Sequence, residues 1–79
     1  MSDIVQEGAE KLARMAAQIA GFFASYPEAQ ASEAIAEHIN KFWGRQMRAE
    51  FLAEFAPGDS RLHPLVAAAL PKIRPPKPF

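Results

Sequence analysis

The residues with the clearest potential for chemistry in this chain lie in the stretch HINKFWGRQMR, residues 38–48. It contains four potentially basic side chains: His38, Lys41, Arg45 and Arg48. On one continuous helix their spacing would place them on one face, whereas a break at Gly44 would make them flank a corner. Arginine binds carboxylates and phosphates through paired hydrogen bonds because its guanidinium group is a planar fork. The stretch therefore indicates either a solvated basic edge or a surface that docks on acidic protein or on phosphate.

An aromatic pair, Phe42-Trp43, lies in the middle of this stretch and includes the only tryptophan of the chain. Adjacent residues on a helix point about 100° apart, so a small bundle cannot fully bury both rings. We therefore expect one ring to be partly exposed, and a partly exposed tryptophan beside arginines is typical of protein interfaces. Phe22-Phe23 presents the same problem earlier in the chain. Two such pairs indicate more apolar surface than the chain can hide by itself.

A polar pair, Arg14 and Gln18, lies four residues apart among apolar neighbours in the first predicted helix. It is either a stripe that faces solvent or a recognition element at the edge of an apolar docking face, and the sequence does not decide between the two. For a docking surface, aromatic side chains would supply contact area and basic ones orientation. The candidate partner-binding residues are Arg14, Gln18, Phe23, His38, Lys41, Trp43, Arg45 and Arg48.

The sequence offers no paired catalytic groups. It has no cysteine and only two histidines, His38 and His63, so a three-ligand zinc site would have to recruit carboxylates. It contains no glycine-rich phosphate loop, no HExxH and no CxxC motif. Glu50 and Glu54 form a like-charged pair of the kind found on a solvated helix face. We expect a chain that is not an enzyme and that binds no cofactor or metal itself, because 79 residues can hardly enclose an active-site pocket.

Nine basic and nine acidic side chains give a formal net charge of zero. This balance argues against a dedicated nucleic-acid binder, which needs a basic excess on one face. No stretch of 18 or more apolar residues is present, so we expect no contact with a membrane. The N-terminal MSDIVQEG is acidic and lacks an apolar signal region, and the absence of cysteine fits a reducing compartment. The expected location is the cytoplasm.

The spacing of apolar residues predicts an all-α fold, a small bundle of three to four helices. In the first segment they recur at threes and fours, for example at Leu12, Met15 and Ile19. Tyr26-Pro27 ends this segment because proline disfavours helical geometry in the residue before it. Helices are predicted over residues 3–25, 28–43 and 45–55, with a short fourth helix from residue 64 to residue 70. A core this small often needs a partner for stability.

Individual residues predict how these helices begin and end. Gly44 offers a left-handed stop to the second helix. Ser60 or His63 can cap the fourth, and Pro64 suits its first turn, where the missing N–H is harmless. We divide the chain into one helical domain, residues 1–70, and a proline-rich basic tail, residues 71–79. The tail is expected to be extended or frayed on its own, or else to be anchored along a partner by Ile73 and Phe79.

Two blocks, KLARMAAQIAGFFASYP and AIAEHINKFWGRQMR, resemble the delta subunit of NAD-dependent formate dehydrogenase, a family of small all-helical proteins. The family pattern runs close to R-M-A-N-Q-I-A-x-F-F, then a proline, then I-A-x-H-I-x-K-F-W-D-P-R-M-R. The later segment HPLVAAAL resembles the family's closing D-P-L-V motif, so the resemblance covers about residues 11–70. The matching residues of the two blocks are Arg14, Met15, Ala16, Gln18, Ile19, Phe22, Phe23, Pro27, Ala36, His38, Ile39, Lys41, Phe42, Trp43, Met47 and Arg48.

The chain departs from that pattern at two places. Ala17 stands where the family usually has asparagine. Gly44, Arg45 and Gln46 replace the usual Asp-Pro-Arg, which removes a helix-capping aspartate, although glycine is acceptable at a cap. Arg45 would stand in for the displaced arginine, shifted by one position.

The resemblance implies a small non-catalytic subunit of a cytoplasmic oxidoreductase complex. The larger subunits would carry a molybdenum or tungsten bis-pterin, iron–sulfur clusters, FMN and the NAD site, and would oxidise formate while reducing NAD. The delta-type chain would bind none of these groups and would dock on the catalytic alpha subunit to stabilise or assemble it. Two alternatives are a transient maturation factor for insertion of the pterin cofactor and a small helix-turn-helix DNA-binding regulator, since Arg45, Gln46 and Arg48 resemble the start of a recognition helix.

Overall fold

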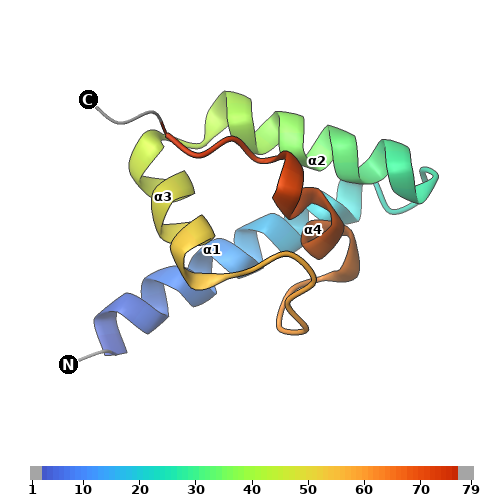
Figure 1. Ribbon diagram of the computed structural model, residues 1–79. Helices are drawn as coiled ribbons and strands as arrows, with labels where there is room; N and C mark the ends of the chain where they lie inside the picture. The colour runs from blue at the N-terminus through green and yellow to red at the C-terminus, as the bar shows by residue number, and fades with distance from the viewer. Residues whose placement is uncertain (1–2, 77–79) are drawn as a thin grey trace.

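Four helices make up the part of the chain that the computed structural model describes, the backbone of residues 3–76 and the side chains of residues 8–76 (Figure 1). No strand occurs within residues 3–76. The all-α prediction is confirmed, and the helices begin within about a residue of the predicted positions. Their bounds are α1 Asp3–Phe22, α2 Glu28–Phe42, α3 Arg45–Glu54 and α4 Pro64–Ala69, with a 3₁₀ turn, η1, at Leu70–Lys72.

The turn between α1 and α2 begins earlier than the sequence predicted, at Phe23 rather than after Ser25. The Phe23 N–H donates to the Ala20 carbonyl at 3.1 Å, and the Tyr26 N–H donates to the Phe23 carbonyl at 3.0 Å. These bonds close a tight turn that brings the chain to Pro27, the residue before α2. Proline disfavours helical geometry in the residue before it, so α1 ends a few residues before Pro27 and the chain turns between the two helices.

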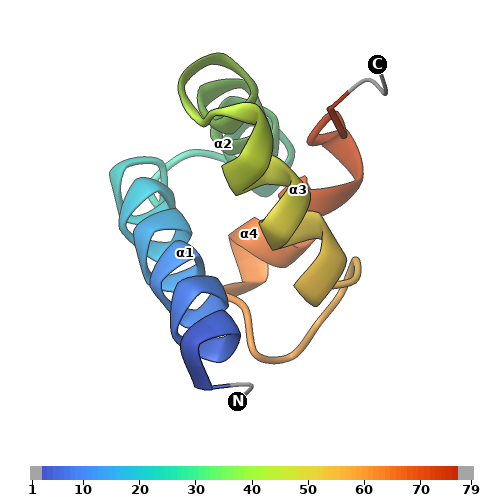
Figure 2. The same ribbon diagram turned by 90° about the vertical axis from the view of Figure 1, so that its left-hand side faces the viewer.

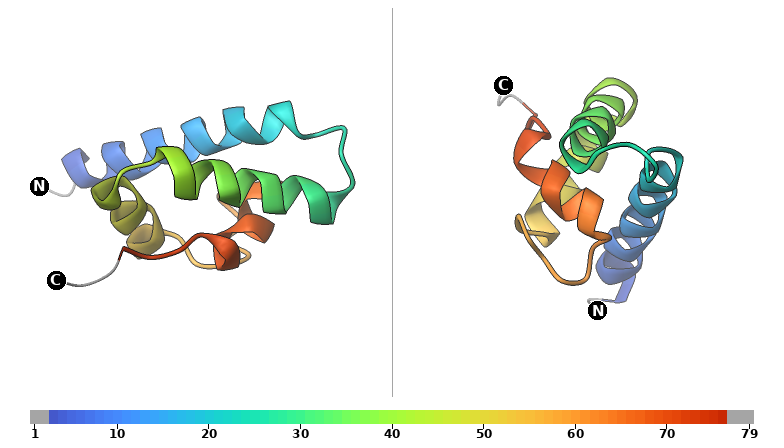
Figure 3. Two further views of the ribbon diagram at one scale, coloured as in Figure 1. Left: turned by 90° about the horizontal axis from the view of Figure 1, so that it is seen from above. Right: turned by 90° about the vertical axis from the view of Figure 1, so that its right-hand side faces the viewer.

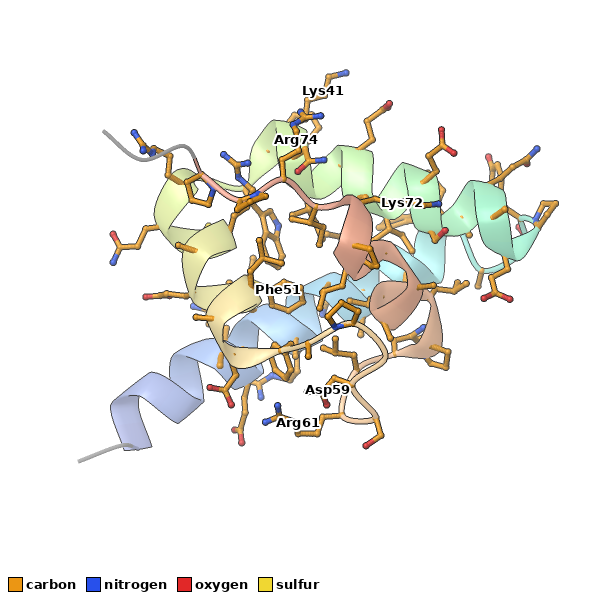
Figure 4. All side chains as sticks on the ribbon, viewed as in Figure 1. Lys41, Phe51, Asp59, Arg61, Lys72 and Arg74 are labelled. Carbon is orange, nitrogen blue, oxygen red and sulfur yellow. The ribbon has the colours of Figure 1, made fainter. Side chains whose placement is uncertain are left out.

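The helices pack in an arrangement that follows from their apolar stripes. α1 and α2 run antiparallel along one side of the molecule, α4 and the C-terminal segment lie on the other side, and α3 closes one end (Figures 2 and 3). Alanines on the inner faces, such as Ala16, Ala20 and Ala36, are buried, and their small side chains permit close approach of the helices. Phe51 of α3 is fully buried at the centre (Figure 4).

The fourth helix begins as its sequence predicted. His63 is its N-cap, and its Nδ1 accepts a hydrogen bond from the Leu65 N–H at 3.1 Å. Pro64 occupies the first turn, where its missing N–H costs nothing. Of the two predicted caps, His63 is the one used.

The C-terminal segment packs against α2 as far as Arg74. Ile73 is buried in the core of this chain. The Asn40 amide of α2 binds the segment on both sides of Ile73: its Nδ2 donates to the Lys72 carbonyl at 3.1 Å, and its Oδ1 accepts from the Arg74 N–H at 2.7 Å. Residues 71–74 are therefore packed against α2 rather than frayed or extended toward a partner, since the Asn40 side chain bonds the Lys72 carbonyl and the Arg74 N–H. The other predicted anchor, Phe79, lies outside the described residues.

Removing the buried side chain of this segment should destabilise the whole domain. Ile73→Ala is expected to lower the free energy of unfolding by about 2–5 kcal/mol, the usual cost of truncating a fully buried isoleucine. Urea unfolding followed by circular dichroism would measure the change. Arg74→Ala is the matched control, because Arg74 is exposed and the contacts described for it use its backbone. Equal stability of the two variants would show that the segment does not complete the core.

The predicted left-handed stop at Gly44 is wrong. Gly44 has φ −67° and ψ 170°, and Trp43 before it has φ −82° and ψ 133°, so two extended residues make the corner between α2 and α3. Gly44 is the N-cap of α3, its carbonyl accepts from the Arg48 N–H at 3.1 Å, and a Cβ added there would meet nothing within 4 Å. Any L-residue fits this conformation. The special freedom of glycine is therefore not used.

An aspartate at this N-cap should stabilise the protein. Gly44→Asp supplies a side-chain acceptor for the first turn of α3, faces the positive end of the helix dipole and reduces the entropy of the unfolded chain. We expect a gain of about 0.5–1 kcal/mol, seen as a rise of a few degrees in Tm. Gly44→Asn is the control that keeps the cap without the charge. A Tm for the aspartate variant equal to or below that of the native chain would contradict this assignment of the cap.

Candidate partner-binding surface

The structure divides the predicted partner-binding residues between two places. Three belong to α1 and the turn after it: Arg14, Gln18 and Phe23. Five belong to the corner where α2 ends and α3 begins: His38, Lys41, Trp43, Arg45 and Arg48. Of the whole set, Arg14, Gln18, Lys41 and Arg45 are exposed, Phe23, His38 and Arg48 are half-buried, and Trp43 is buried.

The aromatic pair at the corner exposes one ring, as the sequence predicted, but the exposed ring is not the tryptophan. Trp43 is 6% exposed, and its ring meets that of Phe51 edge-on with centroids 5.3 Å apart. Phe42 is 70% exposed. The extended backbone at Trp43 ends α2 and turns the indole inward, which leaves the last helical residue pointing out. The prediction that Trp43 offers its ring to a partner is therefore corrected in favour of Phe42.

The first aromatic pair follows the same rule. Phe22, the last residue of α1, is 81% exposed, whereas Phe23 packs against the core and is half-buried. The Phe23 ring also meets the ring of Tyr26 edge-on at 5.7 Å. The more accessible ring here is Phe22, not the Phe23 that the sequence singled out.

Four residues form what we name the corner surface: His38, Lys41, Phe42 and Arg45. The imidazole of His38 packs on the Phe42 ring with centroids 4.8 Å apart and an interplanar angle of 43°. Lys41 projects outward from α2 (Figure 4), and Arg45 is exposed at the start of α3. The corner surface thus presents the exposed Phe42 ring, in contact with the His38 imidazole, close in sequence to the cationic side chains of Lys41 and Arg45. It can insert that ring into a pocket while the cations pair with carboxylates.

Arg48, also predicted at the surface, is used inside the fold. Its Nη1 donates to the Arg74 carbonyl at 2.7 Å, which attaches α3 to the C-terminal segment. Its Nε is buried and has no hydrogen-bond partner among the described residues. The guanidinium therefore makes a contact within its own chain.

Arg14 lies away from the corner surface. It lines an open groove of about 330 Å³ between α1 and the end of α3. The groove mixes both charges with alanine and an aromatic ring, and its lining residues are Ala9, Glu10, Ala13, Arg14, Glu54, Phe55 and Arg61. The structure thus does not bring Arg14 together with Arg45.

Arg61 organises the loop between α3 and α4, and sequence reasoning missed it. Its Nε and Nη2 donate to the two carboxylate oxygens of Asp59 at 3.0 and 2.7 Å, and its backbone N–H donates to the same carboxylate at 2.9 Å. Its Nη1 donates to the Glu54 carboxylate at 3.0 Å, and its guanidinium carbon lies 4.7 Å from the centre of the Phe55 ring. An acidic residue two positions before an arginine in a Pro-Gly turn was the available signal.

The hydrogen bonds from Arg61 lower the pKa of Asp59 from 3.8 to about 2, against an opposing effect of desolvation. A carboxyl group whose pKa is depressed by folding adds stability above its unfolded pKa. That contribution is lost as the pH falls from about 4 to about 2. The loop should therefore loosen in acid.

Asp59→Asn tests this linkage. The neutral amide keeps the shape but cannot form the charged pair, so we expect a lower Tm at pH 7 than in the native chain and a smaller difference at pH 2. Thermal unfolding at a series of pH values would measure it. Glu33→Gln, an exposed neutralisation on α2, is the control. The prediction fails if the native chain and Asp59→Asn lose stability in parallel over that range.

Neither a metal-binding cluster nor a membrane-spanning helix occurs among the described residues. Within residues 8–76 no three histidine, cysteine, aspartate or glutamate side chains gather where they could hold a metal ion. Among the described helices, none is both long and apolar enough to cross a membrane.

Comparison with known proteins identifies a family. The family model of the NADH-dependent formate dehydrogenase delta subunit, FdsD, matches residues 11–70. The matched range runs from the middle of α1 to the end of α4 and the first residue of η1, so it includes both aromatic pairs and the corner surface. No curated protein and no solved structure matches the chain.

Proposed function

Since the chain belongs to the NADH-dependent formate dehydrogenase delta subunit family, we propose that it is a non-catalytic subunit that docks on the catalytic alpha subunit of that enzyme. Docking would stabilise or assemble the alpha subunit in the cytoplasm. The molybdenum or tungsten bis-pterin, the iron–sulfur clusters, FMN and NAD would all be bound by the other subunits. The match extends over most of the chain, which supports carrying the family's role to the whole fold.

The observation that carries the docking proposal is the exposed ring of Phe42. A phenylalanine gains about 1.5–3 kcal/mol when it is fully buried, and 70% of Phe42 is left in water. The His38 imidazole contacts the ring in a tilted arrangement, which restricts the positions the ring can take. Aromatic anchors that are already ordered lose little entropy on binding. Such residues dominate the energy of many protein interfaces.

The cationic side chains near Phe42 would select the orientation in which the partner binds. Lys41 precedes Phe42 near the end of α2, and Arg45 begins α3. Charges at the rim of an interface chiefly speed association and select the orientation, while the buried ring supplies affinity. We therefore infer that the matching site on the alpha subunit is an apolar pocket bordered by carboxylates.

The fold also bears on the two alternatives. A maturation factor would use the same surface but leave before the enzyme is active, so stoichiometry separates it from a subunit. A DNA-binding regulator would present its third helix to a groove, and Arg48 of α3 instead donates to the Arg74 carbonyl of its own chain. That use of Arg48 favours the docking function over DNA binding.

Co-purification tests the proposed function. The tagged chain would be expressed with the other subunits of the enzyme and examined by size exclusion with mass analysis and by formate-dependent NAD reduction. We expect one copy per alpha subunit in the active complex. If the chain elutes alone while activity depends on its co-expression, it is a maturation factor. If the chain neither associates with the other subunits nor affects their activity, both roles are overturned.

A double variant of the corner surface tests the residues. Phe42→Ser with Lys41→Glu should reduce retention of the alpha subunit at least about tenfold, the effect of losing about 1.4 kcal/mol of binding energy. Circular dichroism of the isolated chain should be unchanged, since both side chains are exposed. Lys72→Glu, the same charge reversal at η1, is the matched control and should bind normally. Full retention by the double variant would exclude this surface.

A further inference from the structure

The side of the molecule formed by α1 and α2 is a larger surface than the corner alone. Figures 2 and 3 show these two helices side by side, with α4 and the C-terminal segment on the opposite side. Ala9 and Ala13 of α1 line the groove against α3. On a helix with 100° between residues, Met15 and Ile19 lie on the other flank of the buried stripe, which is the flank that faces α2.

The same reasoning orients α2. Ser32 and Asn40 face the C-terminal segment, because they bind Lys72 and the backbone of Arg74. His38 and Phe42 lie on the opposite flank of α2, which is the flank that borders α1. The two flanks together make one continuous face, which we name the α1–α2 face. Its members are Met15, Ile19 and Phe22 of α1 with His38 and Phe42 of α2.

The α1–α2 face carries its two most exposed rings at opposite ends. Phe22 ends α1 beside the turn into α2, and Phe42 ends α2 next to α3. Because the helices run antiparallel, the two rings are separated by nearly the length of α2, about 20 Å at 1.5 Å per residue. Between them Met15 and Ile19 are partly buried against the core and form a shallow apolar floor. Two anchors and an apolar floor match the length of a helix of about four turns.

Charge distinguishes one end of this face from the other. Lys11 is exposed in the first half of α1, level with the end of α2 because of the antiparallel pairing. Lys41 and Arg45 belong to that same end. The last turn of α1, at the Phe22 end, has no basic residue. An occupant that complements the face is therefore apolar along its length and acidic at one end.

We propose that the α1–α2 face binds one amphipathic helix of the catalytic subunit, of about four turns, whose acidic end meets the cations near Phe42. This inference rests on the proposed function and specifies what the partner contributes to it. Apolar side chains spaced three and four residues apart on that helix would cover Phe22, the Met15–Ile19 floor and Phe42 in turn. Carboxylates at one end of that helix would determine which way it runs along the α1–α2 face.

Photocrosslinking in the assembled complex tests the proposal. A benzophenone-bearing phenylalanine would replace Phe22 in one variant and Phe42 in another, each expressed with the other subunits, and crosslinked peptides would be mapped by mass spectrometry. We expect both positions to reach one helical stretch of the alpha subunit, with acidic residues near the site reached from Phe42. The same probe at Ser60, exposed in the loop before α4, is the control and should not crosslink there.

The outcomes separate this inference from the proposed function. If the native chain does not co-purify with the alpha subunit, the proposed function itself fails. If it co-purifies but neither probe crosslinks, or the probes reach a second copy of this chain or two unrelated segments, only the α1–α2 face is overturned. Charge reversal by Lys11→Glu with Lys41→Glu gives an independent readout. It should weaken retention at least about tenfold and reduce its dependence on salt, whereas Lys72→Glu should do neither.

Discussion

The burial of Phe51 is the contact on which the rest of this small fold depends. Its ring is fully buried and meets Trp43 from the end of α2 at 5.3 Å and Phe55 from the end of α3 at 5.2 Å. These three rings link α2 to α3 in a chain that has no disulfide. Aromatic pairs of this geometry add stability beyond the area they bury. Because Trp43 is drawn inward, its neighbour Phe42 must point out, so the exposed ring is a direct consequence of core packing.

The C-terminal segment solves a second problem of a small domain, the shortage of apolar area. Four helices of 20, 15, 10 and 6 residues leave one side of α2 to be covered, and Leu70 and Ile73 cover it. Asn40 and Arg48 bind backbone groups of Lys72 and Arg74, at and just beyond the end of η1. The chain thus completes its core with its own C-terminal segment.

The apolar residues of α1 and α2 divide into a buried set and a partly exposed set. Each helix has one stripe that faces α3, α4 and the C-terminal segment, and a second flank that remains half-exposed along the α1–α2 face. Phe22 and Phe42 stand at the ends of that flank with most of their surface in water. Both rings stand at the C-terminal ends of their helices.

The sequence by itself determined the helices and several of their boundaries. Apolar spacing, Pro27 and Pro64 act through local backbone geometry, and a local cap such as His63 needs no knowledge of the fold. The motif residues were likewise sufficient to identify the family. These features are readable because each depends on residues a few positions apart in the chain.

Only the tertiary structure decided which side each residue faces. The sequence showed that one ring of each aromatic pair must be exposed, but the choice of Phe42 over Trp43 depends on Phe51 of another helix. Arg45 and Arg48 look alike in the sequence, yet Arg45 is exposed, whereas Arg48 is half-buried and donates to the Arg74 carbonyl of the C-terminal segment. Such outcomes depend on contacts between segments that are distant in the sequence. The rotation of each helix about its axis and the path of the C-terminal segment are set by the packing of the whole core rather than by local backbone preferences.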